Sequence, residues 1–126
     1  MHPFRTAVEA HDIDAALALF SDDVDFRSPV VFKPYKGIDS LRPILTAVAQ
    51  VLEDWTCVRE IGTAEAGDVV LHFRAHIGDR QVEGADFIHH AEDGSIDELM
   101  VMVRPLSATI ALAESVGGQL AVTEGA

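Results

Sequence analysis

The second half of the chain alternates apolar and polar residues over four segments, each about as long as a β-strand. Short turns made of Gly, Asp, Glu and Ala separate these segments. Successive side chains of a strand point to opposite faces, so the pattern predicts strands that are buried on one side. Four strands joined by tight turns predict an antiparallel meander. The segments are residues 55–66, 68–78, 80–92 and 95–105.

The rest of the chain has apolar residues at helical spacing. Asp12 stands where it can cap the second of the predicted helices. Helices are predicted at 4–10, 13–20, 39–53 and from about Leu106 to near Gly117 and Gly118, with a strand at 24–29. Helices first, then a sheet, then a helix indicate an α+β fold in a single domain over residues 1–126.

The last strand of the meander is apolar on both faces. Leu99, Val101 and Val103 alternate with Met100 and Met102. Helices can cover one of these faces. We expect a second copy of the chain to cover the other, because a sheet face that carries two methionines is poorly suited to contact with water.

Composition narrows the possible partners. The 126 residues carry a formal net charge of −12, which argues against nucleic acid and against anionic membrane surfaces. No apolar run approaches the ~18 residues of a membrane span, and the first residues lack a secretory signal. The single cysteine, Cys57, cannot form an intramolecular disulfide. These features predict a cytoplasmic protein.

Asp86 is the most unusual residue of the predicted sheet. It lies in the middle of a strand, between Ala85 and Phe87, although strands disfavour Asp and burial of a charge is costly. One interpretation is a pocket acid that binds a carbonyl or hydroxyl group. The other is a structural carboxylate that pairs with a neighbouring side chain or backbone group. Burial would raise its pKa in either case.

The histidines of the sheet raise the question of a metal site. His72 and His76 flank Arg74, and His89 and His90 follow on the next strand. A zinc site needs three or four ligands, and an arginine between two of them repels a cation. We therefore expect no metal and instead expect these histidines to pair with acids. No Gly-rich phosphate loop is present, so no organic cofactor is expected.

Three motifs, in this order and spacing, resemble a known family. They are ALALFSDDVDFRSPV, then PYKG before a helix, then VEGADFIHHAEDGSIDELMVMVRPL. Together they resemble the nuclear-transport-factor-2-like superfamily and, within it, the SnoaL-like group. The resemblance implies a cone: a curved antiparallel sheet wrapped around N-terminal helices, with a C-terminal helix and a pocket. Relatives include polyketide cyclases, ketosteroid isomerases, limonene-epoxide hydrolases and non-catalytic binders, so the fold alone does not assign a function.

Comparison with ketosteroid isomerases gives specific positions. Asp86 stands eight residues before Gly94, where the resemblance implies an acid that stays protonated and hydrogen-bonds a developing enolate. Ser28 stands where those enzymes carry the proton-shuttling carboxylate. Phe4 stands where they carry the tyrosine that partners the acid. A serine cannot abstract a carbon-bound proton as a carboxylate does. Epoxide hydrolases place an acid on the last strand, where this chain has Val101.

The sequence thus predicts a pocket for one small hydrophobic organic molecule, with Asp86 and Ser28 as catalytic candidates and a homodimer formed through the convex sheet face. An enzyme of this kind would isomerise, cyclise or hydrate a hydrophobic carbonyl compound without a cofactor. The alternatives are a binding or assembly module without turnover and an epoxide-hydrolase-like enzyme. The predicted ligand-binding residues are Phe4, Phe26, Tyr35, Phe73, Val82, Ile88, Leu99, Val101 and Val103.

Overall fold

The computed structural model describes residues 1–125, with side chains up to Gly118 and at Leu120. Helices and strands follow one another in the predicted order. They are α1 (Pro3–Glu9), α2 (Ile13–Leu17), β1 (Phe20–Arg27), β2 (Tyr35–Lys36), α3 (Ile38–Val51), β3 (Glu53–Gly62), β4 (Asp68–Ile77), β5 (Arg80–His90), β6 (Ile96–Arg104) and α4 (Leu106–Gly125). None of the described helices combines the length and the apolar character needed to cross a bilayer.

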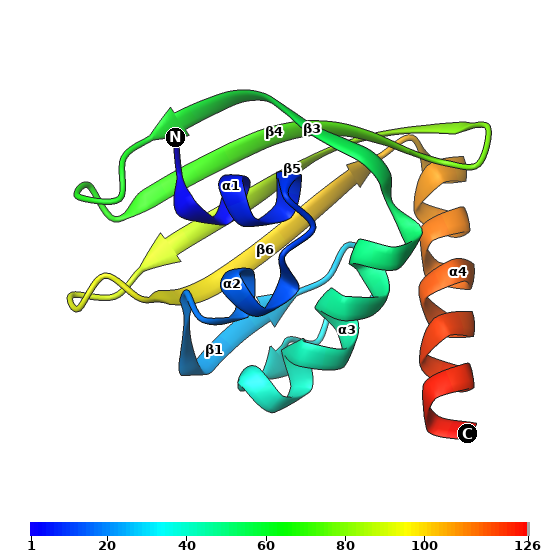
Figure 1. Cartoon of the computed structure of the whole chain (residues 1–126), viewed down its shortest axis with the longest axis horizontal. Helices are drawn as coiled ribbons and strands as arrows, with labels where there is room; N and C mark the ends of the chain where they lie inside the picture. Colours follow the sequence, from blue (N-terminus) through cyan, green and yellow to red (C-terminus); the bar gives the residue numbers. More distant parts are fainter. Residues whose placement is uncertain (126) are drawn as a thin grey trace.

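All six strands form one curled sheet in the order β2-β1-β6-β5-β4-β3. The predicted meander is present as β3 to β6, in which each strand pairs antiparallel with the next. β1 extends this meander at its β6 edge, where it pairs parallel with β6. Helices α1 and α2 lie inside the curl, and α4 stands at the end where β6 finishes (Figure 1). The α+β fold with a curved sheet around the N-terminal helices is therefore confirmed.

Several boundaries differ from the sequence prediction, three of them substantially. β1 begins at Phe20, so the polar segment 21–23, which separated the predicted helix 13–20 from the predicted strand 24–29, belongs to the strand. Residues 30–37, for which no element was predicted, contain the short strand β2. Helix α4 continues past Gly117 and Gly118 to Gly125. In the first case, Phe20 and Asp25 pair with β6 on either side of a register irregularity that contains residues 21–23, and in the second, Tyr35 and Lys36 pair with β1. Local propensity does not include these pairings. In the third, two glycines weaken a helix without ending it.

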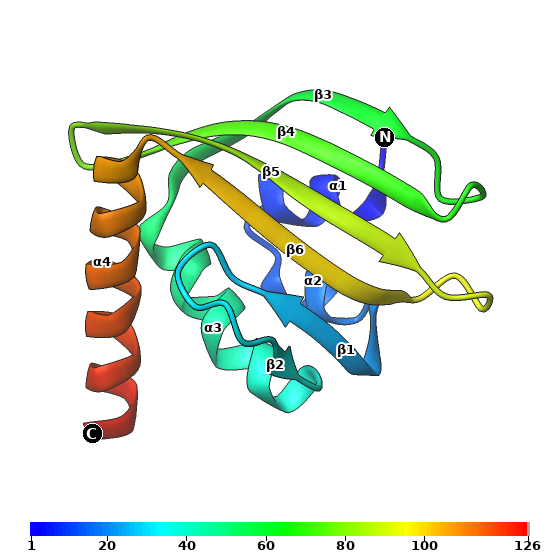
Figure 2. The same ribbon diagram turned by 180° about the vertical axis from the view of Figure 1, so that it is seen from behind.

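The two faces of the sheet have different surroundings. Leu71, Phe73, Ile88 and Leu99 point inward and are buried, each with 1% or less of its surface exposed. The opposite face carries no helix over the middle of β4, β5 and β6 (Figure 2). Met102 on that face remains 53% exposed.

Helix α1 is fixed to the sheet by the residue that precedes it. The backbone N–H of His2 donates to Glu60 Oε1 of β3 at 2.8 Å, and His2 Nε2 lies 2.9 Å from His90 Nε2 of β5. His2 Nδ1 also accepts from the N–H of Phe4 and so caps the helix. Burial, together with His90, lowers the pKa of His2. The first turn of α1 is thereby held against two strands.

Gly84 allows an aromatic ring to lie flat on the inner face of the sheet. It pairs with Phe73 across the β4–β5 ladder, and the Phe73 ring stacks on Trp55 with ring centroids 5.4 Å apart. A Cβ atom at position 84 would lie 2.5 Å from Phe73 Cζ and 2.6 Å from the carbonyl oxygen of Met102. The second contact is with backbone, so the ring alone cannot relieve the overlap.

We therefore predict that Gly84→Ala destabilises the fold by about 1–3 kcal/mol, because the added methyl group overpacks this contact. Gly117→Ala is the matched control. No atom lies within 4 Å of a Cβ added there, and alanine stabilises a helix interior by up to about 1 kcal/mol over glycine. Urea unfolding of both variants measures the difference. Equal stability of Gly84→Ala and the wild type would contradict the close approach described here.

Candidate functional site

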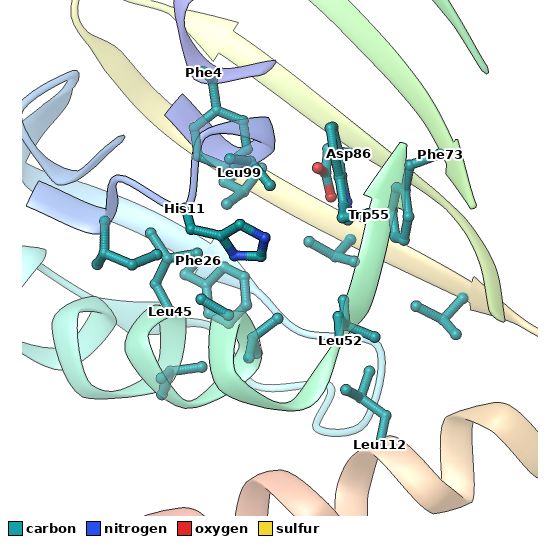
Figure 3. Close-up of a pocket in the computed structure, with 17 residues that line it drawn as sticks. Phe4, His11, Phe26, Leu45, Leu52, Trp55, Phe73, Asp86, Leu99 and Leu112 are labelled. Carbon is teal, nitrogen blue, oxygen red and sulfur yellow. The ribbon is translucent and has the colours of Figure 1, made fainter. Parts of the chain in front are cut away.

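A cavity of about 80 Å³ lies between the inner face of the sheet and all four helices, α1 to α4. Figure 3 shows its side chains converging from these elements. All of the lining residues are hydrophobic except His11 and Asp86. The lining consists of Phe4, Val8, His11, Ile13, Phe26, Ile44, Leu45, Val48, Ala49, Leu52, Trp55, Phe73, Asp86, Leu99, Val101, Val103 and Leu112.

Asp86 reaches the cavity from the middle of β5, between Leu71 of β4 and Val101 of β6 in the ladder. Only 6% of its surface is exposed. Within the part of the chain that the structure describes, its carboxyl group has no hydrogen-bond or ion-pair partner. Burial without such a partner raises the pKa of Asp86 to about 7. The structure therefore does not support the alternative of a carboxylate held in a structural pair.

A carboxyl group with this pKa is protonated in a large fraction of molecules near neutral pH. In that form it carries one O–H donor as well as acceptor capacity. An apolar environment is the usual way in which proteins keep a carboxylic acid neutral so that it can donate a hydrogen bond. Asp86 can thus hold a carbonyl or hydroxyl oxygen of a guest molecule.

His11 is the second polar residue of the cavity, and sequence analysis did not identify it. It connects α1 to α2, and its backbone φ of 56° lies in the left-handed region. Its N–H donates to the Val8 carbonyl, while the N–H of Asp12 donates to the Ala7 carbonyl. This is a Schellman helix end, in which the left-handed position is usually a glycine. His11 is exposed, and its imidazole points toward the lined space (Figure 3).

Most of the predicted ligand-binding residues meet around Asp86. The structure places six of the nine in the cavity lining: Phe4, Phe26, Phe73, Leu99, Val101 and Val103. Val82 and Ile88 share the inner sheet face with Asp86 but are buried in the core outside this lining. Tyr35 packs on Phe26, with ring centroids 6.1 Å apart, and does not line the cavity either.

Ser28, the second catalytic candidate, is engaged in the loop after β1. Its Oγ accepts from the N–H of Val30 at 3.2 Å and of Val31 at 2.9 Å, and it donates to the carbonyl of Val31 at 3.4 Å. The hydroxyl therefore closes a turn before the loop continues. Ser28 is not part of the cavity lining.

The histidines of the sheet also contact polar partners. His72 Nε2 lies 2.9 Å from Glu83 Oε2, and hydrogen bonds from His72, Arg104 and Arg74 lower the pKa of Glu83 to about 2. His89 lies 2.6 Å from a carboxylate oxygen of Asp97. Among the residues that the structure describes, no group of three or more His, Cys, Asp or Glu side chains could hold a metal ion.

Known proteins share both the sequence pattern and the fold of this chain. A family model for the SnoaL-like domain matches residues 2–99. A steroid delta-isomerase structure from Pseudomonas aeruginosa is 37% identical, with a TM-score of 0.90 over 96% of this chain and 88% of that chain. An uncharacterized bacterial protein with a cystatin-like fold from Silicibacter pomeroyi DSS-3 is 28% identical, with a TM-score of 0.86 over 94% and 86% of the two chains.

More distant structures share the fold alone. A SnoaL-like protein from Burkholderia thailandensis E264 is 16% identical, with a TM-score of 0.68 over 82% of this chain and 90% of that chain. No functionally curated protein matches the sequence significantly. The similarity thus fixes the family and leaves the reaction open.

The unpartnered carboxyl group predicts a specific pH dependence of stability. The pKa of Asp86 rises from 3.8 to about 7 on folding, so the native state loses stability as the pH rises from about 4 to about 7. At ~1.4 kcal/mol per pH unit, the loss reaches about 4 kcal/mol. Asp86→Asn removes this loss, so we expect the variant to gain stability over the wild type with rising pH until the gain levels off above pH 7.

Urea unfolding of both proteins between pH 4 and pH 9 measures this gain. Asp79→Asn is the matched control, because Asp79 is exposed in the β4–β5 turn. We expect the control to show no such trend. A constant stability difference between Asp86→Asn and the wild type at every pH would show that the carboxyl group does not titrate as described.

Proposed function

Because the chain belongs to the SnoaL-like domain family, we propose that it binds one small hydrophobic carbonyl compound in the cavity. Asp86 donates a hydrogen bond to the oxygen of this compound. The observation that carries the proposal is the buried carboxyl group without a partner, which an apolar cavity surrounds. A guest with one acceptor oxygen and a hydrocarbon body satisfies both features, since it pairs the acid and fills the apolar space.

The size of the cavity limits the guest. A volume of about 80 Å³ is smaller than the roughly 150 Å³ of an engineered cavity that accepts benzene. A monocyclic compound therefore enters only if lining side chains move apart or if it extends through the mouth. Phe4 and Leu112 line the cavity from α1 and α4. A shift of α4, which carries Leu112, would widen the cavity while α1 stays anchored to the sheet.

We further propose that the bound compound is isomerised. Two observations support an enzyme over a binder without turnover: the raised pKa of Asp86 and 37% identity over nearly the whole chain to a protein named a steroid delta-isomerase. Perturbed carboxyl groups of this kind concentrate at catalytic sites. Epoxide hydrolysis is less well supported, because Asp86 is the only carboxylate in the described lining and Val101 stands at the second acid position.

A second copy of the chain is our proposal for the partner on the outer sheet face. Ala85 pairs with Met102 and Phe87 pairs with Met100, so four apolar residues form one outer patch across β5 and β6. Two-fold stacking of this face on itself brings the same patch together from both copies. Such a contact covers Met102, which is 53% exposed in the single chain.

Binding of cyclohexanone tests the role of Asp86. We expect the affinity of the wild type, measured by NMR titration, to be roughly 30-fold lower at pH 8.5 than well below pH 7, because ionised Asp86 has no hydrogen to donate. Asp86→Asn keeps an N–H donor and should bind without this pH dependence, and Asp86→Leu should bind more weakly at low pH. Asp79→Asn is the control and should behave as the wild type. Absence of binding, or equal affinity at both pH values, would refute the proposal.

The proposed dimer is tested by Met102→Asp, because a carboxylate in the centre of an apolar interface is left buried and unpaired. We expect a dimer for the wild type and a monomer for this variant in light scattering coupled to gel filtration. Ile110→Asp places the same charge on an exposed position of α4 and should remain dimeric. A monomeric wild type would rule out the second copy as the partner of this face.

A further inference from the structure

We propose that His11 is the base of this cavity and that it exchanges a proton with the carbonyl compound whose oxygen Asp86 holds. This inference rests on the proposed binding of such a compound. The proposal is based on the positions of the two polar residues in the cavity lining. His11 enters the cavity from the α1–α2 connection and Asp86 enters it from β5 (Figure 3). Every other lining side chain is hydrophobic and cannot take up a proton.

The backbone at position 11 is one that favours glycine. With φ at 56°, a side chain meets steric resistance that glycine avoids. The structure gives the imidazole of His11 no hydrogen-bond or ion-pair partner among the described residues. The side chain therefore adds strain to the helix end, and no described hydrogen bond or ion pair of its own offsets that strain. Non-glycine residues in this conformation occur preferentially at functional sites.

Contacts of the two neighbouring helices restrain the backbone that carries His11. The first turn of α1 is held by His2, which contacts Glu60 and His90. After His11, the side chain of Asp12 accepts from the N–H of Ala15 and caps α2. His11 therefore lies between an α1 whose first turn is anchored to the sheet and an α2 whose first turn is capped. This arrangement fixes where the side chain of His11 enters the cavity, and such positioning favours proton transfer to a bound compound.

The proposed step is a proton transfer at the carbon next to the carbonyl group. The C–H bond breaks, its proton joins an unprotonated ring nitrogen of His11, and its electron pair forms a carbon–carbon double bond as the carbonyl oxygen gains charge. The O–H of neutral Asp86 stabilises that oxygen. The imidazolium then returns the proton, either to the same carbon, which gives exchange with solvent, or to the far carbon of an unsaturated ketone, which gives an isomer. No electrons or further reactants are needed.

Hydrogen–deuterium exchange of cyclohexanone in D2O tests this step. The loss of the α-hydrogen signals in proton NMR gives the rate, and the titration described above gives the affinity separately. We expect the wild type to accelerate exchange and His11→Gln to lower the protein-catalysed rate roughly 100-fold with its cyclohexanone affinity retained. His76→Gln is the matched control. His76 lies on β4 beside Asp54, outside the cavity, and its substitution should leave the rate unchanged.

A third variant separates a catalytic from a structural role. His11→Gly should raise Tm by roughly 3 °C, because glycine suits the left-handed position, and it should abolish exchange until imidazole is added to the solution. A lower Tm, or wild-type exchange by His11→Gln, would overturn the assignment. Cyclohexanone that binds to the wild type without faster exchange would also overturn it while leaving the proposed binding intact. Absence of binding would remove both.

Discussion

The inner face of the sheet buries a carboxyl group without providing a partner for it, and this constraint governs the site. A charged Asp86 in apolar surroundings is costly, so the group gains a proton at a pH where an exposed aspartate has none. The packing around Gly84, with Phe73 stacked on Trp55, contributes to these apolar surroundings. Burial in the core thus determines the protonation state of the acid, and the proposed ligand would supply the partner that the described residues lack.

Sequence alone was sufficient for much of this arrangement. Alternation along β4 and β5 identified the buried face, and an aspartate in that alternation marked Asp86 as unusual. Alternation cannot tell which part of a face a helix covers, however. Ile88 points inward as Leu99 does, yet it is buried outside the cavity, while Leu99 lines it. The distinction depends on where α1 and α3 cross the sheet, which is a tertiary property.

His11 could not be found in the same way. A left-handed helix end is readily predicted when the residue is a glycine, whereas a histidine carries no such signal. The boundaries of β1 and α4 were misplaced for a related reason, because strand pairing and tertiary packing outweighed local preferences. The polar and breaker residues at 21–23 and at Gly117 are accommodated within regular structure. Local sequence was least informative at the ends of elements, and His11 occupies such an end.

The proposed role of His11 also explains how the cavity could contain a base although position 28 is a serine. By the resemblance to ketosteroid isomerases, Ser28 occupies the position of the catalytic base of those enzymes. In the structure, its hydroxyl forms hydrogen bonds with the backbone of Val30 and Val31. A cavity with an acid and no base can hold a carbonyl compound but cannot remove its proton. An imidazole on a different element restores the missing function without a carboxylate, and it adds no second negative charge near Asp86. Two carboxylates facing one ligand would raise each other's pKa, and an imidazole base avoids that repulsion.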